Sequence, residues 1–554
     1  MSHPNGPRTG RPPAYAPNGV VTTPHYLASS AGLDALRRGG SAVDAAIAAN
    51  AVLTVAYPHM AGLGGDGFWL IAEAGSGGRV HAIDACGPAA AGASLERYQA
   101  RSADGTIAAR GAAAALTVPG AVDGWRLAHE RFGRLPWASL FADASGLARD
   151  GVPVSRSLAD WTATDEPILA ASPAAGAIFL PSGRVPRDGE RLVQADLARS
   201  LEIIAAQGAR AGYYEGVLGA ALSGVGGPDG SPLAPDDFAA YHAEWVEPIR
   251  TTYRGYEVVE LPPSTQGFTV LQLFNLLDGY DVAGWGEGTA DYYHHMAEAV
   301  KVAFADRDEW LTDPRFVDLP IERFISKAYA DERRGLIDPE RAADIAKVPA
   351  GIPYASPHAR SVPDGDTCYF AAADADGMVV SLIQSIYHDF GSGVVADGTG
   401  IILQNRGAFF SLDPAHPNVL APGKRTFHTL VPAMLLQDGE PYLAFGSMGG
   451  EGQPQSQAAM ATRIIDFGYD VQQAIEAPRW LMGRTWGTPS RNLSLEGRIS
   501  DEVVRELKRR GQPVQPVTDW NDNMGHAQAI RVDRAAGLYE GGADPRGDGA
   551  ALGY

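Results

Sequence analysis

Cysteine is scarce in this chain, and acidic residues outnumber basic ones. Only Cys86 and Cys368 occur among 554 residues, so the fold cannot depend on a framework of several disulfides. Lys and Arg total 45 against 65 Asp and Glu, which gives a net charge of −20. Binding to nucleic acid phosphates or to anionic membrane surfaces needs clustered positive charge. We therefore expect neither nucleic acid nor membrane among the partners of this protein.

Long apolar runs are also absent. No stretch approaches the roughly 18 apolar residues that indicate a membrane span. Residues 1–17 are polar and lack the apolar core of a signal peptide. We interpret 1–17 as a disordered tail and expect a cytoplasmic protein, which the low cysteine content fits.

Motifs for cofactors and metals are missing or misplaced. Gly62–Gly67 matches GxGxxG, but a dinucleotide fingerprint follows a strand and opens a helix. Here a helix pattern precedes the glycines and a strand pattern, Phe68–Ile71, follows them. The pair His294-His295 lies within a long helix pattern, where packing or solvation explains it. No Walker loop, HExxH, CxxC or GxSxG motif occurs. We predict no cofactor and no metal.

Strand and helix patterns alternate in both halves of the chain. Ser41 followed by Asp44 predicts a capped helix over Ala42–Ala56, whose small apolar residues indicate deep burial. Further helices are predicted at 121–132, 155–161, 191–206 and 290–311, and a loosely patterned linker at 334–366. Strands are predicted at 68–73, 80–83, 368–374, 378–385, 429–436 and 441–446, with a helix at 452–467. This alternation predicts the α/β class.

The most informative stretch begins at Asp366-Thr367. Asp376-Gly377 is a turn signal between two strand patterns. If 375–377 form the turn, counting back along both strands places Thr367 opposite Ser385. Directly opposed residues have Cβ atoms about 4.5–5.5 Å apart, so two hydroxyls would meet where a linker enters a strand. On the pattern alone, an ordinary Thr–Ser cross-strand pair is the simpler interpretation.

Several ordered motifs resemble the γ-glutamyltransferase family of N-terminal nucleophile hydrolases over nearly the whole chain. They are Gly39–Ala46, Gly62–Phe68, Val118–Gly124, Glu298–Arg307, Asp366-Thr367 and Gly446–Gly450. The resemblance implies a four-layer αββα sandwich (α+β) and a precursor that cuts itself before Thr367. The implied products are a large subunit of 18–366, with the linker at its end, and a small subunit of 367–554. Both would form one αββα unit, and we also consider a dimer of these heterodimers.

The resemblance also implies the chemistry. The Thr367 hydroxyl attacks the carbonyl of Asp366, and water then hydrolyses the resulting ester. This frees an α-amine, a group whose pKa is ordinarily about 7.7–8.0, so one residue supplies both nucleophile and base. Ser385 matches a hydroxyl that orients the nucleophile. Gly449 and Gly450 match the N–H pair of an oxyanion hole, although a Gly-Gly pair alone would simply indicate a flexible turn.

Departures from the family pattern concern the substrate. Cys86 stands where glutamyl-transferring members have a carboxylate-binding arginine, and Phe409 stands where they have an acid for the ammonium group. His428-Thr429 replaces a pair of serines, and Tyr387 replaces an asparagine near the nucleophile. A clamp for glutamate is therefore lost at both ends.

Arg406 stands where the family usually has a neutral amide. Its planar guanidinium suits a carboxylate, so Arg406, with His428, Thr429 and Tyr387 nearby, favours a small anionic amide. The motifs over 384–391, 425–429 and 449–455 resemble the oxamate amidohydrolase-like branch. A structural salt bridge is the plain alternative for Arg406.

The leading hypothesis is a self-cleaving amidohydrolase that acts on an oxamate-like amide through an acyl-enzyme on Thr367. Three alternatives stay open. The first is a γ-glutamyl hydrolase or transferase acting on glutathione-like γ-glutamyl amides, and the second is a cephalosporin-type acylase. The third is a degenerate binding scaffold, against which the intact Asp366-Thr367, Ser385 and Gly449-Gly450 argue.

Overall fold

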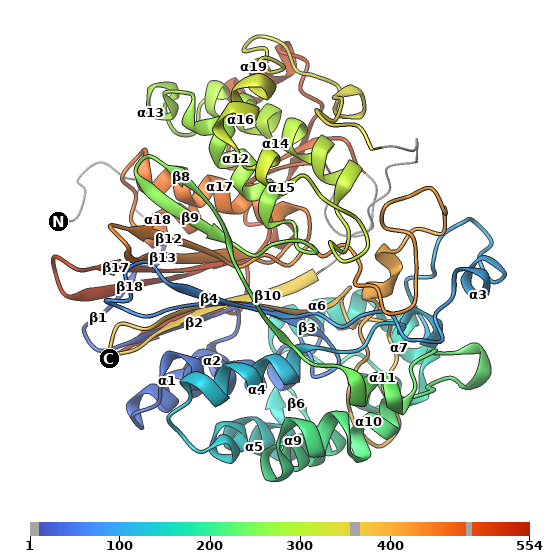
Figure 1. Ribbon diagram of the computed structural model, residues 1–554. Helices are drawn as coiled ribbons and strands as arrows, with labels where there is room; N and C mark the ends of the chain where they lie inside the picture. The colour runs from blue at the N-terminus through green and yellow to red at the C-terminus, as the bar shows by residue number, and fades with distance from the viewer. Residues whose placement is uncertain (1–9, 355–365, 484–489) are drawn as a thin grey trace.

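Two seven-stranded sheets lie face to face at the centre of the molecule (Figure 1). The computed structural model describes residues 10–354, 366–483 and 490–554. The first sheet has the order β1 (Ala14–Ala16), β18 (Leu538–Ala543), β17 (Ala527–Asp533), β13 (Glu440–Ser447), β12 (Ala433–Gln437), β9 (Tyr256–Glu260) and β8 (Ile249–Tyr253). The second has the order β19 (Ala550–Gly553), β2 (Val20–Thr23), β10 (Asp366–Ala373), β11 (Val379–Tyr387), β3 (Asp66–Ala72), β4 (Val80–Ala85) and β7 (Glu244–Val246).

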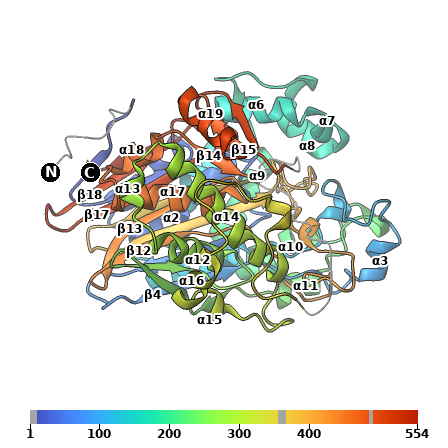
Figure 2. The same ribbon diagram turned by 90° about the horizontal axis from the view of Figure 1, so that it is seen from above.

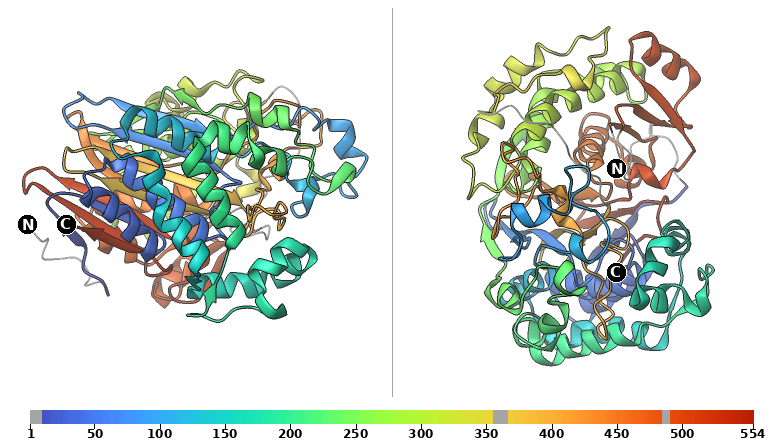
Figure 3. Two further views of the ribbon diagram at one scale, coloured as in Figure 1. Left: turned by 90° about the horizontal axis from the view of Figure 1, so that it is seen from below. Right: turned by 90° about the vertical axis from the view of Figure 1, so that its right-hand side faces the viewer.

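Helices cover the outer face of each sheet. Against the first sheet pack α12 (Gly267–Asp278), α17 (Gly452–Ile465) and α18 (Val471–Glu476), with α14 (Ala290–Trp310) packed on α12. Beneath the second sheet lie α1 (Tyr26–Arg37), α2 (Ala42–Ala56), α4 (Ala121–Phe132), α5 (Ala142–Asp150) and α9 (Ala195–Gly208). Figure 3 shows the second group from below, as blue and teal helices across the sheet. The predicted αββα sandwich is confirmed.

Shorter elements lie at the periphery (Figure 2). One group is α6 (Arg156–Thr164), α7 (Glu166–Ala171) and α8 (Pro173–Phe179). Another joins the small sheet β14 (Trp480–Met482), β15 (Leu493–Glu496) and β16 (Val514–Val517) to α19 (Asp501–Arg509). The remaining helices are α3 (Leu95–Gln99), α10 (Val217–Leu222), α11 (Pro235–Ala240), α13 (Val282–Trp285), α15 (Ile321–Phe324) and α16 (Lys327–Arg334). Among the described helices, none is long and apolar enough to cross a membrane.

Burial follows from the alternation of side chains along the strands. Phe68 and Leu70 of β3 join the core between the two sheets, where they meet residues of the facing sheet such as Met434. Trp69 and Ile71 point the other way, into the core beneath the helices. The predicted capping box at Ser41 is present, and every residue of α2 is buried. Small side chains make this possible because helices can approach α2 from several directions.

The hairpin of β10 and β11 has the predicted turn, with Gly377 at φ +84°. Its register runs from Ala373 opposite Val379 to Cys368 opposite Gln384, as counting from the turn predicts. The register then shifts, because Asp366 faces Tyr387. Two residues of β11, Ser385 and Ile386, therefore stand opposite the single residue Thr367, which is a β-bulge. The prediction of a regular, directly opposed Thr367–Ser385 pair is corrected by this bulge, in which Ser385 is one of the two residues that face Thr367. Bulges re-aim a side chain and are common beside active sites.

Several predicted boundaries differ from the structure. The disordered tail is too long at 1–17, because Ala14–Ala16 form β1 and pair with β18; residues 1–9 lie outside the described residues, as do 355–365 of the predicted linker. The predicted helix at 191–206 begins at Ala195, after the short strand β6 (Arg191–Leu192) that pairs with β5 (Val152–Pro153). The predicted strand at 429–436 begins only at Ala433, since Pro432 has no N–H for the ladder.

Candidate active site

Thr367 lies at the start of the central strand β10, and its side chain is fully buried. Gln453 Nε2 donates a hydrogen bond of 3.3 Å to Thr367 Oγ1. Gln453 comes from the first turn of α17, and its Oε1 accepts from the backbone N–H of Val431 at 3.0 Å. This glutamine was not among the predicted site residues, although it lies in the 449–455 motif. It connects the threonine to the segment that precedes β12.

Ser385, near the end of β11, is held by two N–H donors. Its Oγ accepts from the backbone N–H of Tyr387 at 2.7 Å and from Arg406 Nη2 at 3.1 Å. Tyr387 itself has φ +82°, a conformation rarely adopted by a residue with a side chain. The chain thus bends sharply beside Ser385 and brings Tyr387 back over the arginine.

Arg406, at the start of the short 3₁₀-helix η7 (Arg406–Phe409), is wholly buried without an ion pair to any described residue. Its Nη1 donates to Thr429 Oγ1 at 3.3 Å, and its guanidinium carbon lies 4.5 Å from the Tyr387 ring centroid. No described residue accepts from Nε. Burial lowers the pKa of Arg406 to about 10, so it stays a cation at neutral pH. The salt bridge considered as its alternative role is not formed with any described residue, and the carboxylate whose charge acts most strongly on Arg406 is that of Asp66.

Asp66 and His428 form a buried pair in the same site. Asp66 accepts from the backbone N–H groups of Gly87 and Gly120 at 3.2 and 3.0 Å. Burial raises the pKa of Asp66 to about 7, while the positive charge of Arg406 opposes this. His428 Nε2 lies 3.3 Å from Asp66 Oδ2. Burial lowers the pKa of His428 well below its usual range, so His428 adds no positive charge beside Arg406.

Asp66, Cys86 and His428 also place one potential metal-ligand atom each within 4.8 Å of one another. His428 Nδ1 accepts from the backbone N–H of Leu430 at 3.3 Å, so the proton of the neutral ring belongs on Nε2. A metal would need that Nε2 lone pair. Burial also raises the pKa of the Cys86 thiol well above its usual range. These donors therefore fit a hydrogen-bonded pair beside a neutral thiol better than a metal centre.

Gly449 and Gly450 form the turn between β13 and α17, with φ of +115° and +50°. Their carbonyl groups accept from the N–H groups of Gly452 at 2.7 Å and Gln453 at 3.3 Å. Their own N–H groups have no acceptor among the described residues. The turn thus offers two unused donors at the positive end of a helix, a suitable environment for an anion.

A four-layer αββα sandwich with a threonine at the start of a central strand defines the N-terminal nucleophile hydrolase class. The family model of γ-glutamyltranspeptidase matches residues 28–554. The chain therefore belongs to this family, and it is an enzyme made as a self-processing proenzyme. This confirms the enzymatic hypothesis over that of a binding scaffold.

Relatives in this family carry several activities in their names. The chain is 45% identical over 535 residues to the glutathione hydrolase-like YwrD proenzyme of Bacillus subtilis, covering 96% of this chain and 98% of that one. It is 42% identical over 543 residues to the oxamate amidohydrolase proenzyme of Klebsiella pneumoniae, covering 97% and 98%. The crystal structure of cephalosporin acylase from Bacillus halodurans matches with a TM-score of 0.89 at 37% identity, covering 100% and 98%.

Proposed function

We propose that the proenzyme cuts itself between Asp366 and Thr367, and that the mature enzyme hydrolyses a small anionic amide through an acyl-enzyme on Thr367. Oxamate is the leading substrate. The observation that carries the proposal is Arg406, a buried cation without a carboxylate partner among the described residues, which contacts the Ser385 hydroxyl.

Self-cleavage requires the Thr367 hydroxyl to reach the carbonyl carbon of the preceding residue. The oxygen attacks this carbon, the peptide C–N bond breaks, and the amine takes the proton that the hydroxyl loses. Water then hydrolyses the ester and separates 1–366 from 367–554. Gln453, as a donor to Thr367 Oγ1, orients the hydroxyl, and the N–H groups of Gly449 and Gly450 stabilise the oxyanion.

Turnover uses the same atoms. The new α-amine of Thr367, a group whose pKa is ordinarily about 7.7–8.0, takes the proton of its own hydroxyl as the oxygen attacks the substrate amide. The amide C–N bond breaks, ammonia leaves from a primary amide, and an ester to Thr367 forms. Water attacks this ester and releases the acid. With oxamate the products are ammonia and oxalate.

The anionic character of the substrate follows from the charge balance of the site. Burying an ion costs several kcal/mol unless a counter-charge offsets it. Among the described residues, Arg406 directly contacts hydroxyl groups and aromatic rings, and its Nε has no acceptor there. A substrate carboxylate at this guanidinium would supply the missing charge. The similarity to an oxamate amidohydrolase proenzyme supports the same substrate class.

A γ-glutamyl amide is the second candidate, because of the similarity to the YwrD proenzyme. Its α-ammonium group would need an acid where Phe409 stands. The Phe409 ring instead packs 4.5 Å from the Tyr387 ring and 4.8 Å from the Phe427 ring, centroid to centroid. An ammonium group would lose its hydration there without gaining a counter-ion. The acylase activity named for a similar structure is the third candidate.

Two measurements on the wild-type protein test the proposal. N-terminal sequencing of the smaller fragment should begin Thr367-Cys368-Tyr369. Turnover should be compared for oxamate, a γ-glutamyl anilide and a glutaryl amide, with oxamate expected to have the highest kcat/KM. A fragment that starts elsewhere would remove Thr367 as nucleophile. A higher kcat/KM for the anilide would overturn the substrate while leaving the nucleophile in place.

A further inference from the structure

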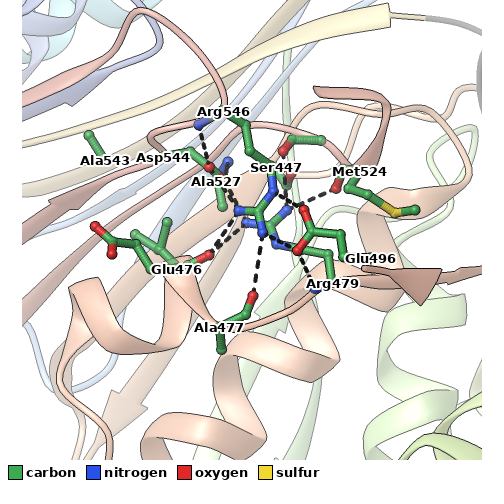
Figure 4. Close-up of polar contacts among 12 residues, drawn as sticks. Ser447, Glu476, Ala477, Arg479, Glu496, Met524, Ala527, Ala543, Asp544 and Arg546 are labelled. Carbon is green, nitrogen blue, oxygen red and sulfur yellow. Dashed lines mark hydrogen bonds and ion pairs between the residues drawn. The ribbon is translucent and has the colours of Figure 1, made fainter. Parts of the chain in front are cut away.

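A network of buried charged side chains lies beside Ser447 and Met524 (Figure 4). Arg479, Glu496, Asp544 and Arg546 are each no more than 2% exposed. Arg546 forms a bidentate pair with Glu496, at 2.7 and 2.8 Å, and a further pair with Asp544 at 2.9 Å. Asp544 also pairs with Arg479 at 2.7 Å. The four side chains form one connected chain of ion pairs.

One end of this network terminates on the backbone of residues 524–527. Arg479 Nη1 donates to the carbonyl oxygen of Met524 at 3.0 Å and to that of Gly525 at 3.3 Å. Asp544 Oδ2 accepts from the N–H of Ala527 at 2.9 Å. Both carbonyls and the amide of this short segment are thereby fixed by side chains that are themselves paired.

The segment 524–527 packs directly against the glycine turn. The carbonyl oxygen of His526 accepts from the N–H of Met448 at 3.1 Å. Gly525 has φ +87°, and a Cβ atom there would lie 2.5 Å from the Met448 carbonyl oxygen and 2.6 Å from Ser447 Oγ. Only glycine permits this approach. The backbone of 524–527 therefore fixes Met448, the residue that leads into the Gly449-Gly450 turn.

The network carries its charges at neutral pH. Burial lowers the pKa of Arg479 to about 10. Burial acts to raise the pKa of Asp544, but the Arg546 and Arg479 guanidiniums outweigh it and the net pKa is lowered. Buried ion networks of this kind are often no more stabilising than apolar residues of the same volume. A gain in folding stability is therefore a weak explanation for these buried charged side chains. Holding a backbone segment in one position, by contrast, requires hydrogen-bond donors and acceptors that point in fixed directions.

We infer that Arg479 and Asp544 are positioning residues that hold the Gly449-Gly450 turn, through residues 524–527, in the geometry that binds the oxyanion. The inference rests on the proposed function, since it takes this turn as the oxyanion hole. Because the same turn serves self-cleavage and turnover, both reactions depend on the network. A displacement of about 1 Å in such donors costs on the order of 100-fold in rate.

The test compares three substitutions along the network with a matched control. Arg479→Met and Asp544→Asn remove contacts to 524–527. Glu496→Gln alters a residue whose side chain forms no hydrogen bond with 524–527: it forms ion pairs with Arg546 and Arg498 and accepts from the backbone N–H of Arg479 at 3.0 Å. Arg463→Met is the control, because Arg463 is equally buried but contacts Glu287 and the carbonyl oxygen of Pro478 and forms no hydrogen bond with 524–527. For each variant, kcat, KM, the rate of self-cleavage and Tm are measured.

We expect Arg479→Met to lower kcat about 10–100-fold with KM changed less than about threefold, and Asp544→Asn to lower it less. Glu496→Gln and Arg463→Met should lower Tm yet leave kcat within about threefold. Arg479→Lys, which keeps a donor, should recover part of the kcat. The inference is overturned if the fall in kcat correlates with the fall in Tm across the variants. It is supported if kcat falls only in the variants that lose a contact with 524–527.

A second readout covers the case in which Arg479→Met cleaves or folds poorly. Methylboronic acid adds to the Thr367 hydroxyl as a tetrahedral anion, so its inhibition constant reports the oxyanion hole directly. With Arg479→Lys, this constant should rise in proportion to the loss of kcat while KM stays constant; an unchanged constant contradicts the inference. Thr367→Ala separates the two proposals. Turnover by this variant would refute Thr367 as the nucleophile. If Thr367→Ala is inactive but Arg479→Met keeps the wild-type kcat, only the positioning role is refuted.

Discussion

Arg406 and Arg479 are both fully enclosed by the protein, and burial lowers the pKa of each to about 10. Their surroundings differ. Arg479 meets the Asp544 carboxylate and backbone carbonyls, so its charge is balanced within the chain. Arg406 meets two hydroxyls and two aromatic rings, and the carboxylate that acts on its charge is Asp66, which forms no ion pair with it and has a pKa raised to about 7. A buried cation that is balanced can serve the fold, whereas one that is unbalanced is suited to an anionic ligand.

The largest effect is expected from Thr367→Ala, which removes the proposed nucleophile. The variant should remain a single chain of 554 residues and show no turnover, because no hydroxyl can attack. Gel electrophoresis and an ammonia-release assay measure both. Two fragments in this variant would mean that the Arg406 site is not the centre of cleavage, and the contrast between the two arginines would lose its functional meaning.

Ser385→Ala should slow self-cleavage and turnover by about 10–1000-fold. The serine is held by Arg406 and by the N–H of Tyr387, so its loss removes a positioned hydroxyl and one partner of the arginine together. Rates of cleavage can be followed after rapid purification of the precursor. Ser381→Ala is the control, since this buried serine of β11 bonds to Tyr369 and the Ala433 carbonyl instead. Equal rates in the two variants would contradict a special role for Ser385.

Arg406→Met tests the substrate side of the contrast. Losing a charge-assisted contact costs about 1.5–3 kcal/mol, so kcat/KM for oxamate should fall roughly 10–150-fold. Self-cleavage involves no substrate carboxylate and should go to completion, although more slowly because Arg406 also contacts Ser385. Arg463→Met, which removes another buried arginine, should retain oxamate turnover. Full oxamate activity in Arg406→Met would reduce Arg406 to a packing residue.

The pH dependence of KM should show whether Asp66 affects the charge of Arg406 at the substrate site. Asp66 has a raised pKa of about 7, so it is neutral below this pH and negative above it. The groups around it are the Gly87 and Gly120 N–H donors, neutral His428, Gln404 and the Arg406 cation. Once ionised, Asp66 partly cancels the charge of Arg406.

The KM for an anionic amide should therefore be lowest below pH 7 and rise above it, by at most about tenfold per pH unit. Asp66→Asn should remove this rise, and a neutral amide should not show it. A pH-independent KM for oxamate in the wild type would separate Asp66 from substrate binding.

The smallest change should be in the stability of Arg406→Met. Removing a buried cation that forms no ion pair and is only partly offset by Asp66 should leave Tm unchanged or raise it. Arg479→Met instead leaves Asp544 short of a partner and should cost about 3–5 kcal/mol. Both are compared by calorimetry at one scan rate in the Thr367→Ala background, so that every sample is uncut. A larger loss of stability in Arg406→Met than in Arg479→Met would mean that Arg406, and not Arg479, is the arginine that stabilises the fold.

The hairpin shows how far local patterns reach. Alternation of side chains and the Asp376-Gly377 turn predict the register correctly from Ala373 to Cys368. The bulge opposite Thr367 was not predicted, because it adds a residue to β11 without any change in the apolar pattern. Gln453 was likewise missed, since nothing in its local sequence indicates that its amide meets a threonine 86 positions away.

By itself, the sequence determined most strands and helices and the hairpin that begins near Thr367, because periodicity, turn residues and helix caps act over a few neighbouring residues. The four-layer fold, the family and the proposed role of Thr367 came from the resemblance of its ordered motifs to a known family. Tertiary structure decided which charges are balanced. His428 finds Asp66 across 362 positions of the chain, and Arg479 finds Asp544 across 65. Burial and pairing depend on what packs against a side chain from distant segments, so the partly balanced charge of Arg406 and the ion-paired charge of Arg479 become distinct only in the folded molecule.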